Sequence, residues 1–184
     1  MQYGPWLSQP REIGIFTRQL VLLREITWRE PYCLSFAFVD LPFLNNQSIL
    51  NILDHDDNVA RLESLLGILN SRLMSFYYKE QAVKSGRKIF PKVVVKDLGQ
   101  FLVPEALSRQ DRIIPSVRSM QALHKQLAST DSASEKGIVL CQINDTNSRI
   151  DQLVYKLYGL ADQEIALIEN STSGAIASKS KAEK

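Results

Sequence analysis

The chain has 184 residues, of which 45% are hydrophobic and 23% are charged. This is an ordinary globular composition with enough apolar residues for a sizeable core, so folding needs no cofactor. The formal net charge of +2 is close to neutral, and any electrostatic evidence for a partner must come from where the charges lie. No stretch approaches the roughly 20 apolar residues of a membrane span and no signal sequence is visible, so we expect a cytoplasmic protein with no membrane partner.

The first half of the chain predicts a small sheet and one long helix. Residues 1–18 are expected to be irregular because Gly4, Pro5, Pro10 and Gly14 interrupt them. Apolar, β-branched and aromatic runs predict three extended segments, at residues 19–27, 32–40 and 48–53. A helix is predicted over residues 59–81, because its apolar positions follow a spacing of three and four.

An acidic cluster, Asp54, Asp56 and Asp57, precedes this helix. Carboxylates are ligands for hard cations, so a metal site is one interpretation. The interpretation that we favour is helix capping by Asp57 or Asn58, since acids before a helix also interact favourably with its dipole.

The second half predicts helices after two short β segments, at residues 92–96 and 101–104. A helix over residues 108–129 contains Pro115, which favours a start nearer Ile114 or a kink. A polar hinge leads to a long helix over residues 136–158, which ends at Gly159. Each helix has an apolar face, so the two should form an antiparallel pair. A short helix is expected at residues 161–169.

These elements predict an α+β fold: a mixed β body with one packed long helix, followed by an antiparallel C-terminal helical hairpin. We expect three parts: a body at residues 1–107, a hairpin or spacer at 108–169, and a disordered tail at 170–184.

Motifs for catalysis are missing from the sequence. None of the eight glycines has GxG spacing, and there is no nucleophile elbow, HExxH or zinc-deaminase pattern. Cys33 and Cys141 form no CxxC pair, which argues against a zinc site and predicts two reduced, buried thiols. We therefore expect no catalytic residue, no metal and no cofactor in this chain.

Basic residues concentrate between residues 79 and 96, where six cations and one acid give a local charge of +5. The glycine in Ser85-Gly86-Arg87-Lys88 would let the backbone approach a phosphate closely. A solvated basic face and an anionic partner are both open interpretations, and we favour duplex DNA. The candidate contacts are Lys84, Arg87, Lys88 and Lys92.

Arginines near the N-terminus form a second candidate set, consisting of Arg11, Arg18 and Arg24. Arginine is suited to bidentate contacts with guanine or phosphate. The alternative is that these arginines pair with nearby acids such as Glu12 and Glu25.

Four blocks in order resemble the TaqI-like C-terminal specificity domain of adenine-specific DNA methyltransferases and type IIG restriction–modification enzymes. They are YGPWLSQPREIGIF with the following QLVLLREIT, the LLGILNSRLMSFYYK helix with Leu69, Asn70 and Ser71, the basic loop from Lys84 to Pro104, and IDQLVYKLYGL with DQEIALIE. The resemblance implies recognition of double-stranded DNA in partnership with a methyltransferase domain or subunit, which would bind S-adenosylmethionine.

Two alternatives to this function remain open. The chain could be a protein-interaction module that pairs through its late helices, or an inactive gene remnant. The family's cofactor motif and its Asn-Pro-Pro-aromatic motif do not occur in this sequence. The chain could therefore be a fragment, a separate specificity subunit or a remnant.

Overall fold

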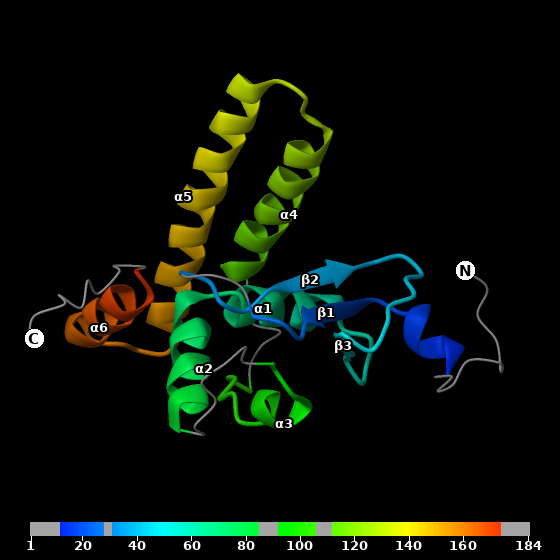
Figure 1. Ribbon diagram of the computed structural model, residues 1–184, viewed down its shortest axis with the longest axis horizontal. Helices are drawn as coiled ribbons and strands as arrows, with labels where there is room; N and C mark the ends of the chain where they lie inside the picture. Colours follow the sequence, from blue (N-terminus) through cyan, green and yellow to red (C-terminus); the bar gives the residue numbers. More distant parts are fainter. Residues whose placement is uncertain (1–11, 28–30, 85–91, 106–111, 174–184) are drawn as a thin grey trace, which may run out of the picture.

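The structure is a computed structural model that describes residues 12–27, 31–84, 92–105 and 112–173, with only the backbone of residues 82–84. Among the described residues, no helix has both the length and the apolar character needed to cross a bilayer. The elements, in chain order, are η1 (Ile13–Phe16), β1 (Leu20–Arg24), β2 (Phe36–Val39), β3 (Ile49–Ile52), α1 (Val59–Leu69), α2 (Arg72–Lys84), α3 (Val95–Leu98), α4 (Ile113–Ser129), α5 (Ala133–Leu157) and α6 (Asp162–Thr172) (Figure 1).

The three predicted extended segments form one antiparallel sheet in the order β2-β1-β3. In the central strand, Leu23 pairs with Phe36 of β2 on one side and with Leu50 of β3 on the other. The first four residues of β1 are all buried, so the strand passes through the core. A short continuous apolar run of this kind is typical of a fully buried strand.

The long helix predicted over residues 59–81 is two helices, α1 and α2, which meet at Asn70 and Ser71. The Asn70 side chain donates to the Phe36 carbonyl at 3.0 Å and accepts from the Phe36 N–H at 2.9 Å. Ser71 Oγ accepts from the N–H of Met74 in the first turn of α2 at 3.3 Å. The single-helix prediction is wrong because the apolar spacing continues across the break, while polar contacts with distant residues end the first helix.

The β segments predicted at residues 92–96 and 101–104 are also wrong. Among the described residues, the β pairing of this region is one isolated bridge between Lys92 and Ile26, two residues beyond the end of β1, and residues 95–98 form the short helix α3. The Asp97 carboxylate accepts from the Val94 N–H at 3.2 Å. This cap at the start of α3 overrides the β-propensity of three consecutive valines.

The two late helices, α4 and α5, lie side by side and are joined by a short turn at residues 130–132, so the chain reverses between them (Figure 1). Pro115 is the third residue of α4, a position in the first helical turn where proline is tolerated, which explains why the helix begins at Ile113. Ser132 caps α5, and its Oγ accepts from the Glu135 N–H at 3.5 Å.

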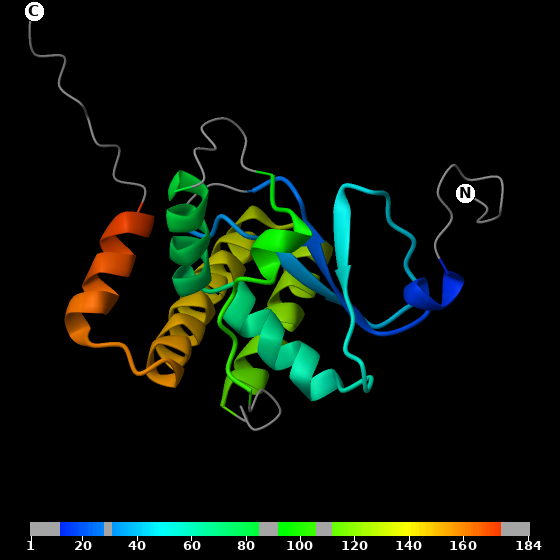
Figure 2. The ribbon, with the colours of Figure 1, turned by 90° about the horizontal axis from the view of Figure 1, so that it is seen from below.

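The sheet, α1 and the base of the hairpin share one apolar core, which includes Val21, Leu62, Ile68, Val117 and Val154. The helices α2 and α6 lie side by side on another flank of the molecule (Figure 2). The predicted α+β class is confirmed. Helix α6 continues to Thr172, three residues beyond the predicted end of the short helix.

The two cysteines have different surroundings. Cys33 is buried as predicted, and its Sγ lies 3.6 Å from the Ser75 carbonyl oxygen. Cys141 is exposed, so the prediction of a buried thiol is wrong there. The apolar stretch around Cys141 is helical, and a helix buries only the face that meets a neighbour.

Candidate nucleic-acid interface

The basic segment, which runs from Lys84 to Lys92, is held at its Lys92 end beside the C-terminal end of β1. The Val93 N–H donates to the Glu25 carbonyl at 2.8 Å, and Lys92 Nζ forms an ion pair with the Glu25 carboxylate at 2.8 Å. Lys84 is the last residue of α2, but its side chain lies outside the described part of the chain. Arg87 and Lys88 also lie outside the described residues. Of the four candidates in this segment, Lys92 alone has a described side chain, and a buried carboxylate offsets its charge.

The N-terminal arginines occupy different places. Arg11 lies outside the described residues. Arg18 Nε donates to Asp57 Oδ1 at 2.7 Å, and its Nη2 donates to the Asp54 carbonyl at 2.9 Å. Arg24 is exposed at the end of β1, roughly 20 Å from Arg18 along an extended chain. The structure therefore brings Arg24 and Lys92 to the same end of β1 and holds Arg18 at the other end.

The acidic cluster before α1 is organised around the helix start. Asn58 is the N-cap, and its side chain accepts from the Arg61 N–H at 3.0 Å, which confirms the capping interpretation. Burial alone would raise the pKa of Asp54, but the N–H groups of Asn58 and Asp56 and the Arg61 guanidinium lower it below its ordinary value. No group of three or more potential metal ligands occurs among the described residues.

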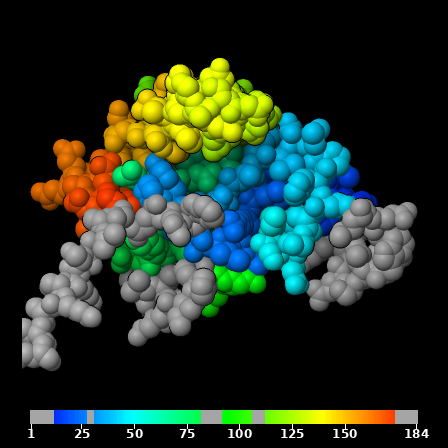
Figure 3. Space-filling model, turned by 45° about the horizontal axis from the view of Figure 1, so that its top comes forward, coloured from blue at the N-terminus to red at the C-terminus, as the bar shows by residue number. Residues whose placement is uncertain are grey.

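A groove of about 680 Å³ separates β2 from the helical hairpin (Figure 3). Leu66, Val117 and Ile150 contribute apolar lining, and the Gln121 Nε2 is buried there without a hydrogen-bond partner among the described residues. The volume lies within the range of small-ligand sites, about 300–1,000 Å³. The charged and imidazole side chains that line the groove are Arg24, Asp40, His124, Lys125 and Asp151.

Arg24 connects this groove with the basic segment. It lines the groove at the end of β1, two residues before Ile26, the bridge partner of Lys92. The groove and the anchor of the basic segment therefore share one end of the central strand. Arginine and lysine side chains, together with polar donors such as glutamine, are the groups that contact a phosphate backbone. Arg24, Lys125 and Gln121 line the groove and are of these types.

Asp151, which lines the groove, joins two of the blocks that carry the family resemblance. Its carboxylate accepts from the Arg72 N–H at 2.8 Å and from the Tyr32 hydroxyl at 2.7 Å. Arg72 directly follows Asn70 and Ser71, so this bond holds α5 against the joint between α1 and α2. Burial raises the pKa of Asp151 to about 6, although these two donors and the Arg72 guanidinium oppose the rise. Burial also raises the pKa of Tyr32.

Sequence reasoning missed several residues of this interface. Gln121, His124 and Lys125 belong to α4, and no local motif distinguishes them from other polar helical residues. They line a groove only because α4 packs opposite β2. Asn70 is part of a family motif, but no local pattern indicates its contact with the Phe36 backbone, 34 residues away.

Comparison with known proteins identifies the family. The chain matches the family model described as the TaqI-like C-terminal specificity domain over residues 1–103. This is a family of DNA-sequence specificity domains of restriction–modification enzymes. A search of curated proteins found no match. The segment from Ile150 to Leu160 lies beyond the matched residues. Because the match covers more than half of the 184 residues, the chain belongs to the family of TaqI-like C-terminal specificity domains.

Proposed function

We propose that this chain recognises a specific sequence in duplex DNA on behalf of an adenine-specific DNA methyltransferase, with or without an attached nuclease. The observation that carries the proposal is the family match over residues 1–103. S-adenosylmethionine would bind to the partner domain or subunit, where the methyl transfer would take place. This chain would supply the contacts that select the site.

The positions of the basic side chains support a set of proposed DNA contacts. The basic segment from Lys84 to Lys92 and the arginines Arg11, Arg18 and Arg24 are the proposed DNA contacts. Arg18 would act through its ion pair with Asp57, which holds its guanidinium in a fixed orientation. Arg24 and Lys92 lie at one end of β1, so they can contact one stretch of duplex together.

Selection from a random duplex library tests this function. The full chain is incubated with duplexes that contain a randomised central region, at a salt concentration that suppresses non-specific binding. We expect enrichment of one short consensus that includes adenine, because the recognition site of an adenine methyltransferase must contain its target base. A duplex with the consensus scrambled is the control. Equal affinity for both duplexes would contradict the proposal, since binding without sequence preference is not specificity.

A further inference from the structure

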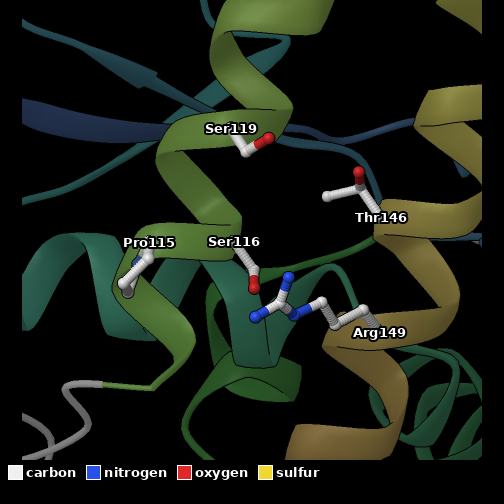
Figure 4. Close-up of a pocket in the computed structure, with 5 residues that line it drawn as sticks. All are labelled: Pro115, Ser116, Ser119, Thr146 and Arg149. Carbon is white, nitrogen blue, oxygen red and sulfur yellow. The ribbon is translucent and has the colours of Figure 1, made fainter.

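A second, smaller cavity lies between the two helices of the hairpin. It has a volume of about 90 Å³ and shares no lining residue with the groove. Pro115, Ser116 and Ser119 of α4 face Thr146 and Arg149 of α5 across it (Figure 4). The volume is several times the space that one water molecule requires, so the cavity can hold a small polyatomic ion.

One of the hydroxyl groups in this cavity is buried and makes no hydrogen bond to the described residues. Ser116 is only 4% exposed, and its Oγ has no hydrogen-bond partner among the described residues. A buried hydroxyl without a partner is costly, so its presence points to a ligand. Thr146 is different, because its hydroxyl donates to the Gln142 carbonyl at 2.7 Å. Ser116 and Ser119 are therefore the hydroxyl donors available to a ligand here.

Arg149 supplies the positive charge. Its guanidinium extends from α5 toward Ser116 (Figure 4), and no carboxylate among the described residues forms an ion pair with it. Four other arginines, Arg18, Arg61, Arg72 and Arg118, do form such pairs. Ser116 also lies in the first turn of the 17-residue helix α4, where the helix dipole favours an anion and no acidic residue is present.

From this geometry we infer that the cavity is an oxyanion site that takes a phosphate group, held by the Arg149 guanidinium and the Ser116 and Ser119 hydroxyls. Arginine is suited to bidentate contacts with phosphate, and serine hydroxyls add neutral donors. The phosphate belongs either to the DNA backbone or to free phosphate. The first source rests on the proposed function, and the second does not.

Inorganic phosphate is the probe for the first arm of the test. The melting temperature of the full chain is measured in sodium phosphate and in sodium chloride at equal pH and ionic strength. We expect phosphate to raise the melting temperature of the wild type, because a ligand stabilises only the state that binds it. The melting temperatures of Arg149→Gln and Ser116→Ala should be the same in phosphate and in chloride. Ser116→Ala removes an unpaired buried hydroxyl, so this variant should fold at least as well as the wild type.

Duplex DNA is the probe for the second arm. The affinity of the wild type and of Arg149→Gln is measured over a range of salt concentrations. Loss of one phosphate contact should reduce the slope of log affinity against log salt by about 0.9. Lys136→Gln is the matched control, because it removes one positive charge from an exposed residue of α5 that does not line the cavity.

The two arms separate the site from the proposed function. If phosphate stabilises Arg149→Gln as much as the wild type, the site is overturned even where the chain binds DNA. If phosphate stabilises the wild type alone and the DNA slope falls only in Arg149→Gln, the site takes a DNA phosphate. If the first result holds but the wild type has no affinity for DNA at any salt concentration, the proposed function fails and the site is one for free phosphate.

Discussion

Asp151 is a carboxylate that the fold removes almost completely from water, with 3% of its surface exposed. Two donors from separate segments, the Tyr32 hydroxyl and the Arg72 N–H, meet on it. The residue combines the roles of a helix cap and of an ion-pair partner. It bonds to the first N–H of α2, a helix to which it does not belong, and it lies 3.5 Å from the Arg72 guanidinium. Its function in the fold is to connect α5 with α2.

A pH dependence of stability follows from this burial. The pKa of Asp151 is about 6 in the folded protein against 3.8 in the unfolded chain, so between these values the folded state binds more protons. The contribution of Asp151 is therefore most favourable below pH 4 and is lost as the pH rises through about 6, by about 3 kcal/mol in all.

Urea unfolding of the wild type and of Asp151→Asn at pH 4 and pH 7 measures this effect. Asparagine has similar size and does not titrate, so the wild type should lose about 2 kcal/mol relative to the variant between these two pH values, since the unfolded carboxyl is already partly ionised at pH 4. Other titrating groups contribute equally to both proteins and cancel in the comparison. Identical pH dependence in both would show that Asp151 titrates normally in the folded state.

At the scale of elements, the crossing of α1 and α4 depends on one glycine. A Cβ added at Gly67 would lie 2.6 Å from a methyl carbon of Ile113 and 2.8 Å from one of Val117, both buried. These distances are too short for carbon atoms, so the absence of a side chain allows α4 to lie directly on α1. An ion pair at 2.7 Å between the buried Glu63 carboxylate and the exposed Arg118 guanidinium also joins the same two helices.

Two alanine substitutions test this crossing. Gly67→Ala should lower the free energy of unfolding by about 1–3 kcal/mol, because the extra methyl group must displace packed side chains. Gly137→Ala is the matched control, since nothing lies within 4 Å of its added Cβ and it is within α5. The control should raise stability by up to about 1 kcal/mol through helix propensity. Denaturant titration of both variants measures the difference, and equal gains in stability would mean that α4 does not depend on Gly67.

At the scale of the whole molecule, the distribution of charge matters more than its total. The net charge is +2, yet described cations such as Arg18, Arg61 and Arg118 are paired with acids. Pairing reduces the attraction that these residues exert on a distant polyanion. The proposed DNA affinity must therefore depend strongly on a few positions, and the basic segment that includes Lys84, Arg87 and Lys88 is the main one.

Simultaneous substitution of Lys84, Arg87 and Lys88 by glutamine tests this dependence. If all three contact phosphates, the slope of log affinity against log salt should fall by about 2.7, or about 0.9 for each contact. The control removes the same charge by substituting Lys179, Lys181 and Lys184, near the C-terminus, and should leave the slope unchanged. Fluorescence anisotropy with labelled duplex measures both. An unchanged slope in the first variant would exclude this segment from the interface.

The sequence by itself determined the features that depend on neighbours along the chain. The α+β class, the cap at Asn58, the start of α4 near Pro115 and the end of α5 before Gly159 follow from propensities and side-chain contacts within about four residues. Motifs in fixed order also led to the family, although the family match ends at residue 103, before the helical hairpin.

Only the tertiary structure decided the features that join distant residues. Asn70 separates α1 from α2 by bonding to Phe36, and Asp151 meets Tyr32 from 119 residues away. The groove beside β2 and the cavity at Arg149 likewise exist because helices pack against each other and against the sheet. Periodicity records which face of a helix is apolar, but it contains no information about which polar residue will meet another across the core. That pairing depends on packing, which brings together residues whose separation in the chain carries no local signal.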